Sequence, residues 1–299
     1  MDWIAGIMNT YFDRKALEKL ESFEPLELVV RKFNQYGIEK ILRIQYTGSN
    51  LKVTPNNFPG VYDALIEACT ILDLPFVPQL YICWNYIVNA FTAGSENPII
   101  VLNSGCIDLL THEELLFILG HEVGHIKSEH VLYHQMASVI PFMGNLLASA
   151  TLGLGGLVTA GLEIALYNWK WMSEFTADRA GLLACQDPRV AASALAKAAG
   201  APVKYHEAIN VDEFIVQARE FEGYDYDALD KAAKVFSIMW QDHPWTVMRA
   251  AESFRWIDSG EYGRIIRAGT EYREAKRNAS TGTGIEAWVS SKVREFEQY

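Results

Sequence analysis

The chain lacks the cysteine pattern of a disulfide framework or of a cysteine-rich zinc site. Its four cysteines are widely spaced and form no C-x-x-C pair: Cys69, Cys83, Cys106 and Cys185. This spacing favours buried thiols in a reducing compartment. The first residues, Met1 to Lys19, lack a basic segment followed by a clean apolar run, so we expect no signal peptide and a cytoplasmic location.

The chain is also poor in positive charge. It has 26 Lys and Arg against 37 Asp and Glu, a formal net charge of -11. This balance argues against nucleic acid, and against an anionic membrane surface, as the main partner. With 299 residues, 50% of them hydrophobic, the chain can bury a large core.

One short motif carries most of the chemistry. The residues from His121 to His125 read H-E-x-x-H. In a helix, His121 and His125 lie one turn apart on the same face, so both rings can bind one metal ion. Glu122 then lies beside the metal and can take a proton from an activated water. The alternative is a helix with two surface histidines, but the surrounding segment is mostly apolar, and burial of three polar groups requires a partner.

The third ligand is sought downstream, because the glycine and histidine of a metzincin site are replaced here by Ser128 and Val131. Glu174 and Asp178 are four residues apart on an expected helix and point the same way. Glu174 can bind the metal while Asp178 accepts a hydrogen bond from the far nitrogen of a ligand histidine. The alternative is a solvated acidic face that pairs with nearby cations.

Two further histidines, His130 and His134, also lie four residues apart, but no acidic residue stands between them. We interpret them as residues that support the ligands or end the helix, rather than as ligands.

Taken together, these motifs resemble a known family. H-E-x-x-H followed downstream by E-F-T-A-D-R-A-G, at 174–181, is similar to the zinc peptidases that include CaaX prenyl proteases and HtpX-like proteases. The similarity extends to 89–94, 98–105 and the pair His243-Pro244, and covers about residues 55–260. The resemblance implies a gluzincin-type zinc endopeptidase, with Glu122 as the base and one zinc ion on His121, His125 and Glu174.

The expected fold is α+β and predominantly helical: a gluzincin-like peptidase domain with a small mixed sheet and a helix that carries H-E-x-x-H. We expect an N-terminal helical and strand region at 1–54, belonging to the same domain, a metallopeptidase domain at 55–260 and a helical tail at 261–299.

The expected elements follow from periodicity and from capping signals. Helices are predicted at 13–34 and 61–72, and strands at 38–46, 78–84 and 99–103. Thr111 and Glu114 fit a capping box at the start of the motif helix. Asp187 and Pro188 are typical of a helix start, and Gly200 of its end.

The segment from Met136 to Leu162 has no charged residue. A single bilayer span of about 20 residues would fit its length, but it would put Glu174 and the motif helix on opposite sides of the membrane, and two spans would need about 40 residues. Pro141 and the glycines favour a helical hairpin beside the cleft; a hairpin that inserts shallowly into one leaflet is the alternative.

The function expected from these residues is hydrolysis of peptide bonds in extended or unfolded polypeptides by a zinc-activated water. His243 is the candidate second donor to the oxyanion; the alternative is a histidine at an ordinary helix start. Substrate is expected to lie along the exposed edge of the strand at 99–103. Two alternatives remain: a zinc hydrolase of a small amide, and a non-enzymatic, chaperone-like zinc module.

Overall fold

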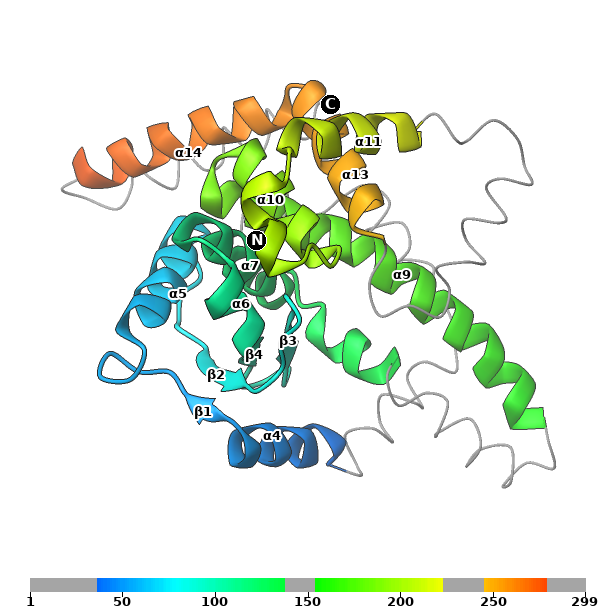
Figure 1. Ribbon diagram of the computed structural model, residues 1–299. Helices are drawn as coiled ribbons and strands as arrows, with labels where there is room; N and C mark the ends of the chain where they lie inside the picture. Colours follow the sequence, from blue (N-terminus) through cyan, green and yellow to red (C-terminus); the bar gives the residue numbers. More distant parts are fainter. Residues whose placement is uncertain (1–36, 138–153, 223–244, 279–299) are drawn as a thin grey trace.

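The computed structural model describes residues 37–137, 154–222 and 245–278. The described chain is mostly helical, with a small four-stranded mixed sheet (Figure 1). This confirms the expected α+β class. The helix predicted at 13–34 lies outside the described residues.

The sheet consists of β1 (Leu51–Lys52), β2 (Gln79–Cys83), β3 (Ala90–Ala93) and β4 (Ile99–Asn103), in the order β1-β2-β4-β3. β2 and β4 are parallel, and the other two pairs are antiparallel. The strands predicted at 78–84 and 99–103 are confirmed. β2 and β4 each have a neighbour on both sides, whereas β1 and β3 end the sheet.

Side chains alternate between the two faces of the sheet, as expected for strands. One set, including Leu80, Ile82, Ile100 and Leu102, joins the main hydrophobic core. The other set, including Tyr81, Ile99 and Val101, forms a small second cluster. The core face packs under α5 (Pro59–Ile71), which confirms the predicted helix at 61–72, and under α7 (His112–Lys127).

The predicted strand at 38–46 is wrong, because this segment is helical: α4 (Ile38–Ser49). Half-buried Leu42 and Tyr46 are four residues apart and share one face of the helix. The Tyr46 ring packs against Phe91 of β3, with ring centroids 4.9 Å apart. Apolar and polar residues alternate here over a short stretch, as in a strand. The apolar residues that meet the sheet nevertheless follow the helical period.

α7 begins at the predicted capping box. The Glu114 N–H donates to the Thr111 hydroxyl at 3.3 Å, and the Thr111 N–H donates to the Glu114 carboxylate at 2.7 Å. The Glu114 carboxylate also accepts hydrogen bonds from Lys197 and Ser193 of α10 (Pro188–Ala198). These bonds offset the cost of burying its charge. The start of α7 is therefore fixed both locally and by a tertiary contact.

α7 packs most extensively against α9 (Leu154–Cys185), and glycines allow the two helices to approach closely. A Cβ at Gly120 would lie 2.5 Å from that of Ala184, and one at Gly124 would lie 2.5 Å from that of Ala180. Since the candidate ligands lie on these two helices, this close contact sets their separation.

We expect Gly120→Ala to lower the free energy of unfolding by about 1–3 kcal/mol, because the new methyl overpacks the α7–α9 contact. Gly269→Ala is the matched control: it lies in a helix where an added Cβ meets no atom within 4 Å, so it should stabilise the protein by about 0.5–1 kcal/mol. Denaturant unfolding of both variants measures this difference. Equal stability of the Gly120→Ala protein and the wild type would contradict the close packing.

The C-terminal part adds further helices. They are α10, α11 (Val211–Glu222), α13 (Thr246–Asp258) and α14 (Glu261–Asn278), with a 3-10 turn at Val203–Ala208. Of these, α10 packs against α7 and α9, and α13 packs against α9 and α10. The start of α10 is as predicted: the Asp187 side chain accepts from two backbone N–H groups, and Gly200, beyond the helix end, has φ 101°. α13 brings the buried Arg249 side chain to Asp178 of α9 and His121 of α7.

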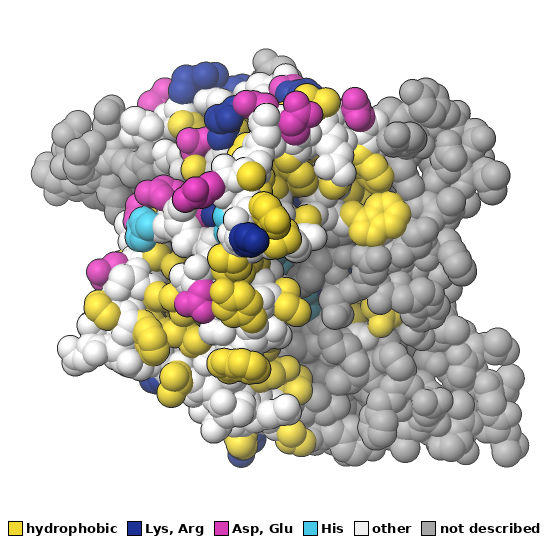
Figure 2. Space-filling model, in the orientation of Figure 1, with side chains coloured by type: hydrophobic (Ala, Val, Ile, Leu, Met, Phe, Trp, Pro, Cys, Tyr) yellow, Lys and Arg dark blue, Asp and Glu magenta, His cyan; other side chains and the backbone are white. Residues whose placement is uncertain are grey.

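The short helix α6 (Ser104–Leu109) joins β4 to the segment before α7. Figure 2 shows hydrophobic side chains gathered over the sheet, and charged side chains over the C-terminal helices. Trp84, in the loop between β2 and β3, is 91% exposed. This face is therefore divided into an apolar and a charged region.

The hairpin predicted at 136–162 falls largely outside the described residues. Residues 154–162 belong to α9, which continues to Glu174. Within the described ranges, no helix combines the length and apolarity needed to span a membrane.

Candidate metal centre

Two helices supply the donor atoms of the candidate metal centre. His121 and His125 lie on adjacent turns of α7, and Glu174 lies on α9. The two Nε2 atoms are 3.1 Å apart, and they lie 3.5 and 3.4 Å from the Glu174 carboxylate oxygens. All three side chains are buried. In the described part of the chain, no other group of three His, Cys, Asp or Glu side chains has this spacing.

These separations match the requirement of one small cation. Zinc binds nitrogen and oxygen at about 2.0–2.2 Å, so neighbouring ligand atoms of a tetrahedral site lie about 3.3–3.5 Å apart. The buried ring nitrogens and the carboxylate face one another at nearly this spacing. The donor set therefore fits a zinc ion.

Asp178 and Arg249 hold the His121 ring from behind. The Asp178 carboxylate lies 2.9 Å from His121 Nδ1 and accepts two bonds from Arg249, at 2.8 and 2.5 Å. Burial raises the pKa of Asp178, but Arg249 outweighs it and the net pKa is lowered. The ionised carboxylate can only accept, so Nδ1 carries a proton, and Nε2 is the ring atom left to bind a metal.

The charge around His121 favours a protonated ring before a metal binds. Burial lowers the pKa of His121, but the hydrogen bonds to Asp178 and Glu174 outweigh it and raise the pKa to about 9. Binding of a cation at Nε2 must therefore release a proton.

The His125 ring is held differently. Its Nδ1 lies 3.0 Å from Nδ1 of His130, so its partner is an imidazole rather than a carboxylate. Burial lowers the pKa of His125 to about 3, so the ring is neutral at physiological pH. With the proton on Nδ1 and donated to His130, Nε2 of His125 also presents a lone pair to the centre. His130 thus contacts a ligand.

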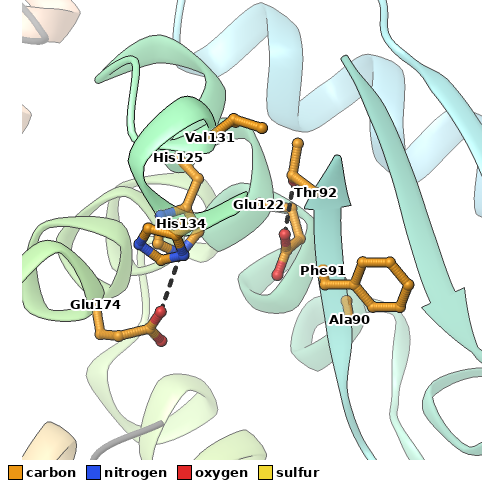
Figure 3. Close-up of a pocket in the computed structure, with 8 residues that line it drawn as sticks. All are labelled: Ala90, Phe91, Thr92, Glu122, His125, Val131, His134 and Glu174. Atoms are coloured by element: carbon orange, nitrogen blue, oxygen red, sulfur yellow. Dashed lines mark hydrogen bonds and ion pairs between the residues drawn. The ribbon is translucent and has the colours of Figure 1, made fainter. Parts of the chain in front are cut away.

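His134 lines the same pocket, beside Glu174 and His125 (Figure 3). Its Nε2 lies 2.7 Å from the Ser173 hydroxyl, and that hydroxyl donates its single proton to the Lys170 carbonyl. His134 must therefore donate from Nε2 to Ser173. Burial lowers the pKa of His134 well below its usual value, so the ring is neutral.

Glu122 lies on the sheet side of the pocket, next to the ligands but directed away from Glu174 (Figure 3). Its carboxylate accepts a hydrogen bond of 2.7 Å from the Thr92 hydroxyl of β3. Ala90, Phe91 and Thr92 line the pocket, so the end strand of the sheet forms one wall of the site.

The structure brings together His121, His125, Glu122, Glu174 and Asp178, all of which were expected from the two motifs. His243 lies outside the described residues. Arg249 and Thr92 were missed, because each is far in sequence from the side chain it contacts and no local spacing pairs them. The sequence identified the segment 89–94 only as part of the family resemblance.

The expected substrate strand is wrong. β4 is paired with β2 on one side and β3 on the other, so its backbone groups are already used. The edge of the sheet next to the pocket belongs to β3.

A fold with a small sheet, two packed helices and a buried His-His-Glu centre defines a class of metallopeptidases. Residues 61–256 match peptidase family M48, and the chain belongs to that family. This confirms the resemblance to HtpX-like peptidases. The family implies a metal and a peptide or protein substrate.

Several individual relatives agree. The plastoglobule-localized metallopeptidase 48, chloroplastic, of Arabidopsis thaliana is 32% identical over 77% of this chain and 66% of its own length. A protease HtpX homolog 2 of Methanosarcina acetivorans is 27% identical over 56% of this chain and 63% of its own length. A protease HtpX homolog of Persephonella marina is 28% identical over 46% of this chain and 56% of its own length. No solved structure matches the chain.

These matches cover less than two thirds of the relatives' own lengths. They also correct one expectation. The cytoplasmic location predicted from the sequence is contradicted, because the Arabidopsis relative is named for chloroplast plastoglobules. A signal peptide directs a protein only to secretion, and organelle targeting segments have a different composition. The composition of Met1 to Lys19 therefore does not decide between the cytoplasm and an organelle.

Proposed function

We propose that the chain is a zinc-dependent endopeptidase that hydrolyses peptide bonds of extended or unfolded polypeptides. One observation supports the proposal above all: three buried donor atoms lie at zinc spacing, and two of their residues, His125 and Glu174, line a pocket together with Glu122 and the edge strand β3. Membership of peptidase family M48 supports the reaction class.

One zinc ion per chain would be held by His121, His125 and Glu174. A bound zinc ion supplies Lewis acidity, which makes a water molecule more acidic and polarises the scissile carbonyl. Asp178 and His130 each accept the Nδ1 proton of one ligand histidine, so both Nε2 lone pairs point to the centre.

Glu122 is the proposed general base. Its carboxylate is buried, and Glu122 lines the same pocket as His125 and Glu174. It takes the proton of the attacking water and returns it to the nitrogen of the leaving amine. His243 stays the candidate for a further donor to the oxyanion.

The outer edge of β3 is the proposed place for the substrate backbone. An extended peptide beside Ala90–Ala93 would continue the sheet through main-chain hydrogen bonds. Such binding selects unfolded segments over folded ones and depends little on side-chain identity.

Incubation of the zinc-loaded protein with casein and with short peptides tests the proposal. Cleavage of casein at several internal bonds is expected, and it should stop when zinc is chelated. Cleavage of neither substrate would favour the small-amide hydrolase. Zinc-independent binding of casein without cleavage would favour the chaperone-like module.

Asp178→Asn should lower zinc affinity about 10- to 100-fold, since an amide cannot hold the His121 ring as a carboxylate does. The same change leaves Arg249 buried without its anion, which costs about 3–5 kcal/mol of stability. The two effects are separable. Asp178→Asn combined with Arg249→Met should recover most of the stability but not the zinc affinity. A double variant with wild-type affinity would show that Asp178 acts only through folding.

A further inference from the structure

We propose that Thr92 is a positioning residue: its hydroxyl holds the Glu122 carboxylate in the orientation needed for proton transfer. This inference rests on the proposed function, in which Glu122 is the base. It begins from a contact between two elements that are distant in sequence, the edge strand β3 and the helix α7.

The direction of the hydrogen bond is fixed by chemistry. A threonine hydroxyl has one proton, and an ionised carboxylate can only accept. The 2.7 Å contact is therefore donation from Thr92 Oγ1 to Glu122 Oε2. A bond to an ionised group is among the stronger hydrogen bonds in proteins.

The surroundings make Thr92 a rigid donor. Its β-branched side chain has restricted rotation, and its strand is fixed by pairing with β4 at Ile100. Alternation along β3 directs Thr92 toward Glu122, while the Phe91 ring points away and packs on Tyr46 (Figure 3). Glu122 is 3% exposed, so bulk water cannot easily replace a lost donor.

The placement also links substrate to base. Thr92 uses its side chain to hold Glu122, and its strand edge is the one proposed to receive the substrate backbone. The Thr92 side chain thus links the strand β3 to the Glu122 carboxylate at a fixed distance. A carboxylate without this bond has additional rotamers, and only some of them reach the attacking water.

The test compares Thr92→Val, which keeps the shape and removes the hydroxyl, with Thr92→Ser, which keeps the hydroxyl and removes the methyl. For Thr92→Val we expect kcat to fall about 10- to 100-fold, with KM within about twofold and zinc content unchanged. Thr92→Ser should retain kcat within about threefold. Thr70→Val, at an exposed threonine of α5, is the matched control and should leave both constants unchanged.

Two results would overturn the proposal: a wild-type kcat for Thr92→Val, or an equal loss for Thr92→Val and Thr92→Ser, which would assign the effect to strand packing. Crystal structures of the wild type and Thr92→Val provide a readout that does not depend on activity. The Glu122 carboxylate should leave its wild-type position in the variant, and an unchanged position would refute the role of Thr92. A wild type that cleaves no peptide would refute the proposed function instead.

Discussion

Glu122→Gln should reduce turnover by about 100- to 10,000-fold, because the amide cannot accept the proton of the attacking water. The side chain keeps its size, and none of the three proposed ligands is touched. Zinc should therefore stay bound at one ion per chain, and the melting temperature should change little. Initial rates with casein, measured beside zinc content, test this expectation.

Glu113→Gln is the matched control for this change, since Glu113 lies at the exposed start of the same helix. It should have wild-type rates. A Glu122→Gln protein that cleaves casein at the wild-type rate would remove Glu122 from the mechanism. Loss of zinc in that variant would instead show that Glu122 supports the metal.

His121→Ala and Glu174→Ala should each abolish hydrolysis and remove most of the zinc. Each change removes one of three donors to the same ion, and a site with two remaining ligands binds far more weakly. His112→Ala is the control, because His112 lies on the same helix with a side chain that is 52% exposed. Elemental analysis of the purified variants measures the effect, and undiminished zinc after either ligand change would exclude this site.

Each pair of candidate residues could be predicted because its spacing is local to one helix, whereas the meeting of the two pairs depends on the packing of α7 against α9. Histidines four residues apart share a helix face whatever the tertiary fold, and the same spacing pairs Glu174 with Asp178. The start of α7 was equally local, since a capping box is complete within four residues.

The remainder of the site depends on contacts between distant segments. Arg249 reaches Asp178 from another helix, and Thr92 reaches Glu122 from a strand. Sheet order decided which strand has an open edge, and order cannot be obtained from strand periodicity alone. The segment that became α4 was misread because its apolar residues alternate over a short stretch, and tertiary packing settled the helix.

Anomalous diffraction at the zinc absorption edge, from crystals of the wild-type protein, tests the central claim most directly. We expect one strong peak per chain, about 2.0–2.2 Å from Nε2 of His121, Nε2 of His125 and a carboxylate oxygen of Glu174. A zinc-loaded crystal with its peak elsewhere, or with His121 and His125 turned away from the ion, would contradict it.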